Sequence, residues 1–291
     1  MFRLPEALKS SSHPLVRQAR LLGRQPRRRR EAGLFLIEGP TALAEALAAG
    51  SRPVWVLVAS PHIGQEPYRS LIQRLLGEEV PVQPVQRDLL ERTAPTSHGP
   101  GLLAACRLPA TADDPRTVLD RRTSGLVVVC WKIQDPGNLG TLVRSAAAFG
   151  AGGLVAVAGA DPWSPKAVRS SAGAIHRLPT ARATDAAILL ERLEQDGQPL
   201  VAALPRGGVT PSALSWEGAP RLLLGAEVAG LPEALVSAAT TVSIPMEAGS
   251  ESLSVAVAGS ILLETAARLR RKDISGAGGP TGSGRPGSQD D

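Results

Sequence analysis

The chain has 291 residues and a formal net charge of +5, a length that suits two domains of ordinary size, each able to bury a core. With only two cysteines and no strongly apolar run of about 20 residues, it excludes a disulfide framework and a membrane-spanning helix. Residues 1–6 lack the apolar core of a signal peptide, so we expect a cytoplasmic protein.

Residues 1–31 form a basic segment. Lysine and arginine are frequent in its first thirty residues, where Glu6 is the single acid. Such clusters are typical of surfaces that bind polyanions, although a solvated charge run is the simpler alternative. The predicted RNA-binding residues here are Arg20, Arg24, Arg27, Arg28, Arg29 and Arg30.

Residues 32–107 alternate between apolar runs and segments with helical patterning. The pattern predicts strands at 33–38, 54–58 and 80–82 and helices at 41–49 and 68–76. This alternation is typical of an α/β module. A stretch rich in proline and aspartate at 108–124 predicts a linker.

A second α/β domain is predicted at 125–272. It begins with a buried strand at 126–130, a turn, and a helix at 139–149 for which Asn138 is the expected N-cap. Arg144 is the only charged side chain between Asp135 and Asp161. A guanidinium is costly to bury alone, so we expect Arg144 to meet a specific partner, either substrate or a carboxylate elsewhere.

The next segment contains a second predicted basic site. Ser164 and Pro165 are typical of a helix start, with Lys166 and Arg169 in the first turns. Helix N-termini bind anions, so these two side chains are predicted to contact RNA phosphates, with a plain basic surface helix as the alternative. The glycines at 150–153 follow a helix and open a strand, which indicates a turn and not a dinucleotide site.

Three further segments complete the domain. Residues 221–232 predict a strand that runs into a glycine-bounded loop containing Glu227, and residues 242–246 and 251–258 lead into a long helix. The apolar residues 255, 258, 261, 262 and 266 of this helix suit either a core or an interface. The glycine- and serine-rich tail at 273–291 predicts disorder.

Taken in order, these motifs resemble those of the SpoU/TrmH family of RNA ribose 2′-O-methyltransferases, in the SPOUT class. The matching positions are Asn138, Gly140, Arg144 and Ala146 in the first motif, Gly225, Glu227 and Gly230 in the second, and 244–246 with 251–253 in the third. The resemblance implies an α/β protein with a C-terminal SPOUT trefoil-knot domain and a smaller N-terminal α/β substrate-binding domain.

The resemblance also implies S-adenosylmethionine as the methyl donor. It assigns donor binding to Gly225, Ile244, Met246, Leu253 and Ser254, and catalysis to Arg144 supported by Asn138, Glu227 and Ser252. Arginine stays protonated in proteins, so we expect Arg144 to stabilise the developing alkoxide and orient a phosphate instead of acting as a general base. Ser254 replaces the family's usual asparagine, which predicts looser or compensated donor positioning.

Several functional assignments remain open at this point. The family resemblance implies an RNA partner and a homodimer, and the separate basic module favours ribosomal RNA over tRNA. A non-catalytic RNA-binding or ribosome-assembly protein and an antibiotic-resistance methyltransferase are alternatives on the same fold. The four histidines lie far apart and lack ligand neighbours, so we expect no metal.

Overall fold

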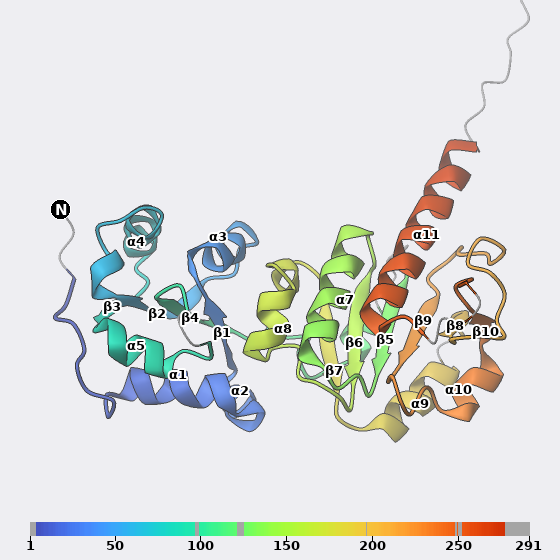
Figure 1. Ribbon diagram of the computed structural model, residues 1–291, viewed down its shortest axis with the longest axis horizontal. Coiled ribbons are helices and arrows are strands. Elements are labelled where there is room, and N and C mark those ends of the chain that lie inside the picture. Colours follow the sequence, from blue (N-terminus) through green and yellow to red (C-terminus); the bar gives the residue numbers. More distant parts are fainter. Residues whose placement is uncertain are drawn as a thin grey trace, which may run out of the picture.

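The computed structural model describes residues 4–96, 99–120, 125–195, 197–247, 249 and 252–276. Figure 1 shows two α/β domains side by side, with the basic N-terminal helices in the first domain and a long C-terminal helix leaving the second. The described part of the chain contains no helix long and apolar enough to cross a membrane.

The N-terminal domain is built on a four-stranded mixed sheet of order β1-β4-β2-β3. Its strands are β1 (Leu34–Glu38), β2 (Pro53–Ala59), β3 (Val82–Val85) and β4 (Leu102–Arg107). Strands β2 and β3 are parallel, whereas β4 runs antiparallel to both of its neighbours. Its helices are α1 (Pro14–Arg24), α2 (Pro26–Ala32), α3 (Pro40–Ala48), α4 (Tyr68–Gly77) and α5 (Arg87–Thr93), with a 3₁₀ turn η1 (Ser60–His62).

The basic segment belongs to this domain and is not a separate arm. Val16, Ala19 and Leu22 of α1 are fully buried in a cluster with residues of β1, β2 and β4, such as Leu36 and Leu57. The arginines therefore lie on an amphipathic helix whose apolar face is fixed to the sheet. This arrangement holds the exposed basic side chains on a rigid support.

The C-terminal domain is a six-stranded sheet of order β10-β8-β9-β5-β6-β7, parallel throughout. The strands are β5 (Val127–Trp131), β6 (Gly153–Val157), β7 (Thr180–Ala183), β8 (Leu200–Ala203), β9 (Arg221–Gly225) and β10 (Thr240–Val242). The helices are α7 (Pro136–Ala148), α8 (Pro165–Ser170), α9 (Ala186–Gln195), α10 (Glu233–Ala238) and α11 (Val255–Gly276), with a 3₁₀ turn η2 (Ala174–His176). The α/β fold with two domains is confirmed, and the trefoil knot remains a prediction.

Helix α7 begins three residues earlier than expected, and its N-cap is Asp135 instead of Asn138. The Asp135 carboxylate accepts a hydrogen bond from the backbone N–H of Gly137 at 2.9 Å, and Pro136 occupies the first helical position. Aspartate is as good a cap as asparagine, and proline is favoured directly after the cap. The side chain of Asn138 is therefore free for another role.

Close packing places α7 between two other helices. A Cβ atom on Gly140 would lie 2.3 Å from the carbonyl oxygen of Ala167 in α8, so only glycine allows this approach. On the other side, the hydroxyl groups of Ser145 and Ser260 lie 2.7 Å apart and join α7 to α11. Helix α7 thus connects the junction between the domains to the helix that follows the third motif.

The segment predicted as a linker is packed in its described part. It contains the short helix α6 (Arg116–Leu119), whose Val118 and Leu119 are buried beneath the C-terminal sheet. The carbonyl oxygen of Ala112 accepts a hydrogen bond from the backbone N–H of Arg182 at 2.9 Å. Helix α11 continues to Gly276, beyond the expected boundary at 272, and residues 277–291 of the predicted tail lie outside the described residues.

Candidate active site

A cavity of about 250 Å³ opens at the carboxyl ends of β8, β9 and β10. This is the edge at which parallel α/β sheets bind ligands. Its walls are Ala203, Leu204 and Pro205 after β8, residues 224–228, 230 and 231 after β9, Val242, Ile244 and Met246 after β10, and Ser252, Leu253, Val255, Ala258 and Leu262 leading into α11. The second and third sequence motifs therefore meet in one site.

The wall contributed by β9 depends on a glycine. A Cβ atom on Gly225 would lie 2.6 Å from the carbonyl carbon of Gly230 and 2.8 Å from the backbone nitrogen of Leu231. The backbone N–H of Gly230 donates to the carbonyl oxygen of Ala226 at 2.9 Å and closes the loop between them. Residue 225 must be glycine for this loop to fold back onto the strand and leave the cavity open.

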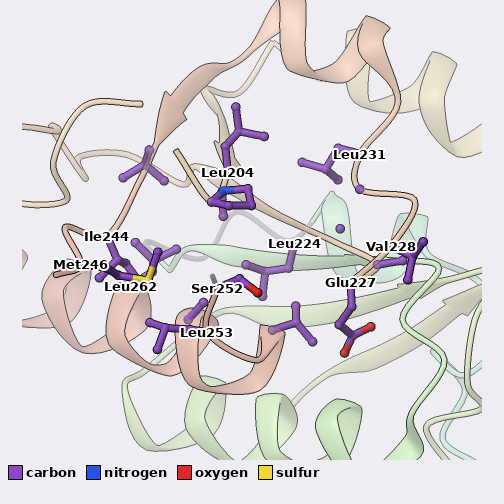
Figure 2. A pocket seen from close by; sticks show the side chains of 18 residues that line it. Leu204, Leu224, Glu227, Val228, Leu231, Ile244, Met246, Ser252, Leu253 and Leu262 are labelled. Carbon is purple, nitrogen blue, oxygen red and sulfur yellow. The ribbon is translucent and has the colours of Figure 1, made fainter. Parts of the chain in front are cut away.

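The cavity has one apolar end and one polar end. Figure 2 shows Ile244, Met246 and Leu262 on one side, Glu227 on the other, and Ser252 between them. The apolar end suits a flat or aliphatic group, and the carboxylate of Glu227 suits a cation at the rim. The predicted donor contacts Gly225, Ile244, Met246 and Leu253 all line this cavity.

A side-chain hydrogen bond joins the first motif to the second. The Asn138 amide nitrogen donates to a carboxylate oxygen of Glu227 at 2.8 Å. A charged acceptor makes this a stronger bond than one between neutral groups. It fixes the rim loop to the first turn of α7, next to the cavity.

Arg144 lies on the outer face of α7, and of its two predicted partners a carboxylate is not found among the described residues. Its side chain is exposed on α7, and it does not line the cavity. Among the described residues no carboxylate forms an ion pair with it. The surrounding apolar side chains point to the sheet and Arg144 points to solvent, because a 13-residue helix has a buried face and an outer face. It is therefore available to a ligand that approaches from outside.

Comparison with known proteins gives the family. Residues 125–264 match the SpoU rRNA Methylase family, and residues 13–104 match the MRM3-like substrate binding domain. An uncharacterized tRNA/rRNA methyltransferase of Synechocystis is 32% identical over 271 residues, which cover 90% of this chain and 93% of that protein. The chain belongs to the SpoU methylase family.

Other SpoU proteins resemble this chain over most of its length. A 23S rRNA (uridine(2479)-2′-O)-methyltransferase of Streptomyces viridochromogenes is 34% identical over 266 residues, 86% of this chain and 88% of that protein. The crystal structure of the SpoU methyltransferase AviRb from that organism, in complex with AdoMet, superposes with a TM-score of 0.77 at 28% identity over 89% of this chain and all of that one. An AdoMet-bound rRNA methyltransferase of Sinorhizobium meliloti gives 0.76 at 26% identity, covering 91% and 98% of the two chains.

Ser254 lies beside the SpoU cavity but is not part of its wall. Its hydroxyl accepts a hydrogen bond from the backbone N–H of Val257 at 3.4 Å, and its carbonyl oxygen accepts one from Ala258 at 2.9 Å. These contacts identify Ser254 as the N-cap of α11. Serine fulfils this capping role as well as the family's usual asparagine does, and its direct contact with the donor stays a prediction. The neighbouring motif residue Glu251 lies outside the described residues.

The arginines of the basic N-terminal segment differ in their exposure to solvent. Arg24, Arg27, Arg28 and Arg30 are exposed, and Arg20 is partly exposed. Arg29 is buried, so the prediction that it contacts RNA is wrong. Its guanidinium turns toward the second domain, where it pairs with Asp161 at 2.8 Å. A run of four arginines on a helix must point to several sides, and one of them meets a carboxylate.

The two basic residues of α8 are exposed and each has an acidic neighbour. Lys166 lies 2.6 Å from Asp135, and Arg169 lies 3.5 Å from Glu38 of the first domain. The Lys166 ammonium group and the Gly137 backbone N–H lower the pKa of Asp135. Exposed pairs of this kind are weak, so both cations remain available to phosphate.

Several cavity residues escaped the sequence analysis. Leu204 follows β8, a strand of four residues that was not predicted, and Val228 is fully exposed at the tip of the loop after Glu227. The short apolar run at 200–203 next to a proline was the available signal. A strand predicted there would have placed a third strand end beside those of β9 and β10, at the edge of the sheet where ligands bind.

Proposed function

We propose that this protein methylates a ribose 2′-hydroxyl of 23S-type ribosomal RNA, with S-adenosylmethionine as the methyl donor. Membership of the SpoU family makes it an RNA 2′-O-ribose methyltransferase. The observation that carries the proposal is the cavity at the ends of β8, β9 and β10, next to the bonded Asn138 and Glu227.

The cavity suits the donor in shape and chemistry. Ile244, Met246 and Leu253 offer apolar contacts to an adenine ring, and the glycine at 225 lets the loop that lines the cavity pack back onto β9. The Glu227 carboxylate, at the rim of the cavity, would attract the positively charged donor. When bound, S-adenosylmethionine supplies a methyl group on a positively charged sulfur.

The side chains at the rim have separate roles in this proposal. Asn138 holds the Glu227 carboxylate in place, and Ser252 offers a hydroxyl to a ligand in the cavity. Arg144, exposed on α7, binds the RNA phosphate and stabilises the negative charge that develops on the ribose oxygen. Because the guanidinium stays protonated, the proton of the hydroxyl leaves to water or another base.

The RNA lies along the basic residues of both domains. The exposed side chains of Arg20, Arg24, Arg27, Arg28 and Arg30 on α1 and α2, and of Lys166 and Arg169 on α8, bind its phosphates. The ribosomal substrate is favoured by the 23S rRNA activity named for the Streptomyces relative and by the match to a substrate-binding domain.

A homodimer is part of the same proposal. Val257 and Ile261 are 46% and 38% exposed and lie four residues apart in the first turns of α11. This spacing gives one apolar stripe on the helix. Val255, Leu262 and Ala266, by contrast, are core residues. Ile261→Glu should convert the dimer to a monomer in analytical ultracentrifugation, and an unchanged dimer would place the interface elsewhere.

One assay tests the enzyme and its substrate together. Purified protein and methyl-labelled donor are incubated with ribosomal subunits, naked rRNA and tRNA, and the modified nucleotide is mapped by mass spectrometry. The proposal expects label in a single ribose of the large-subunit RNA. Label confined to tRNA would overturn the substrate, and the absence of label together with no donor binding in calorimetry would favour a non-catalytic RNA-binding protein. The protein is expected to act in the cytoplasm, in keeping with its buried free thiols Cys106 and Cys130.

A further inference from the structure

All three nitrogen atoms of the Arg29 guanidinium have acceptors inside the protein. Arg29 is 2% exposed, and its Nε and Nη2 atoms lie 2.9 Å and 2.8 Å from the same oxygen of Asp161. Its Nη1 donates to the carbonyl oxygen of Leu22 at 2.7 Å. Arg29 thus joins the end of α1, helix α2 and the loop after β6, which are parts of both domains.

Asp161 is held from the other side by a second buried arginine. Its Oδ1 atom accepts hydrogen bonds from Arg182 Nη1 at 3.1 Å and from the backbone N–H of Trp163 at 3.0 Å. Arg182 also pairs with Asp113 of the segment between the domains at 2.6 Å, and lies 5.5 Å from the ring centroid of Trp163. The charges form one connected network, so neither arginine is left alone.

A buried ion pair between two domains favours one relative orientation of the domains more than it raises the free energy of unfolding. The cost of removing two charges from water offsets most of their attraction, but any other docking of the two domains would bury one of them without its partner. In the part of the chain that the structure describes, the other ion pairs across the junction are Arg169 with Glu38 and Arg177 with Glu45. Each is exposed on the arginine side and holds the domains more weakly. Apolar contacts such as that of Phe35 with His176 also join the domains, and the buried pair adds a directional constraint that apolar contacts lack.

We propose that Arg29 and Asp161 are positioning residues that fix the substrate-binding domain in a single orientation on the methyltransferase domain. The exposed arginines of α1 and α2 are then held at a constant distance from Lys166, Arg169 and the donor cavity. Arg29 acts through its neighbours and does not touch the RNA. The effect on RNA binding rests on the proposed function, whereas the effect on domain orientation does not.

Distance measurements between the domains test the orientation without RNA. Spin labels are attached at Gln73→Cys on α4 and Glu191→Cys on α9, both exposed positions. The two natural cysteines do not compete, because Cys106 and Cys130 are buried. We expect one narrow distance distribution in the otherwise unchanged protein and a broad one with Arg29→Met. Arg87→Met, which removes an exposed arginine paired with Glu91, is the matched control and should stay narrow.

A milder variant covers the case in which Arg29→Met does not fold. Arg29→Lys keeps the charge but loses the two-pronged contact with Asp161 and the bond to Leu22. It should broaden the distribution less than Arg29→Met and still bind donor with normal affinity in calorimetry. A distribution as narrow as that of the Arg87→Met control in every folded Arg29 variant would overturn the proposal.

Kinetics separate positioning from direct RNA contact. Arg29→Lys and Asp161→Asn should each raise KM for RNA by about tenfold, since small misplacements of bound groups have effects of this size or larger. The double variant should be no worse than either single one, because both remove the same device. If Arg29 contacted RNA itself, Asp161→Asn would leave KM unchanged and the two effects would be independent, which would overturn the proposal.

Discussion

The junction between the domains and the donor cavity are built from opposite kinds of side chain. The junction is held by the buried charges of Arg29, Asp161 and Arg182, whereas the cavity is walled by apolar side chains and a glycine-bounded loop. Buried charges permit one arrangement, because every other arrangement leaves a charge unpaired. Apolar walls accept a ligand with little directional demand. The molecule is therefore most constrained where its domains meet and more adaptable at the cavity.

The sharpest way to break this contrast is to neutralise the carboxylate at the centre of the junction. Asp161→Asn leaves the buried guanidinium of Arg29 without a counter-charge and removes one of the two carboxylates that pair with Arg182. We expect a loss of about 3 to 5 kcal/mol in the free energy of unfolding. Urea denaturation of both proteins measures it. The control is Asp114→Asn, which neutralises the solvent-screened partner of Arg116 and should cost far less stability than Asp161→Asn. Equal losses would contradict the account of the junction.

Acid should weaken the junction through His176. The ring of His176 packs against Phe35 across the junction, and burial, with a smaller effect of Arg177, lowers its pKa to about 4. Below about pH 6.5 the unfolded chain takes up a proton that the folded protein refuses, so stability present at neutral pH is lost as the pH falls toward about 4.

The variant His176→Phe removes this titration. Relative to the variant, the wild-type protein should lose on the order of 3 kcal/mol of unfolding free energy between neutral pH and about pH 4. Chemical denaturation of both proteins over this range gives the difference. Parallel stability profiles would show that His176 is not held neutral at the junction.

The cavity side of the comparison is tested by Gly225→Ala. The added methyl group would meet the backbone of the loop at 2.6 Å, so the loop must shift into the cavity. We expect a loss of about 1 to 3 kcal/mol in stability and weaker donor binding in calorimetry. Gly77→Ala, at a position with nothing within 4 Å, should be neutral or slightly stabilising. Normal donor affinity in the Gly225 variant would disconnect the loop from the donor site.

The smallest effect is expected at the cap of α11. Ser254→Asn should change stability by less than about 0.5 kcal/mol, because both side chains accept the capping hydrogen bond, whereas Ser254→Ala should cost about 1 kcal/mol. Donor affinity should follow the same order. A large gain in donor affinity with asparagine would mean that residue 254 contacts the donor directly.

Much of the fold could be predicted from the sequence because its elements are locally well marked. The apolar strand before residue 131 and the proline-led helix at 165 carry strong local signals, and both are confirmed. The turn predicted at 136 is instead the first turn of α7. Strands β4, β7, β8 and β10 were missed. Of these, β4 and β8 are short runs rich in alanine, and only their place inside a sheet makes them strands.

The exposure of two informative arginines did not follow from their neighbours in the sequence. Arg144, isolated among apolar residues, is exposed, and Arg29, in a run of arginines, is buried. Local composition predicts the average environment of a segment, but burial of one side chain depends on which face of the helix it occupies. The pairing of Arg29 with a carboxylate 132 residues away leaves no local trace in the sequence.

The central claim is that α7, the loop after β9 and the start of α11 form one active site, in which Arg144 contacts the RNA from outside the cavity. Its most direct test is the turnover of Arg144→Ala on the RNA substrate, with donor affinity and unfolding free energy measured in parallel. Because Arg144 is exposed and outside the cavity wall, we predict unchanged stability and donor affinity, with turnover reduced by about 10² to 10³. Near-normal turnover in this variant would contradict the account.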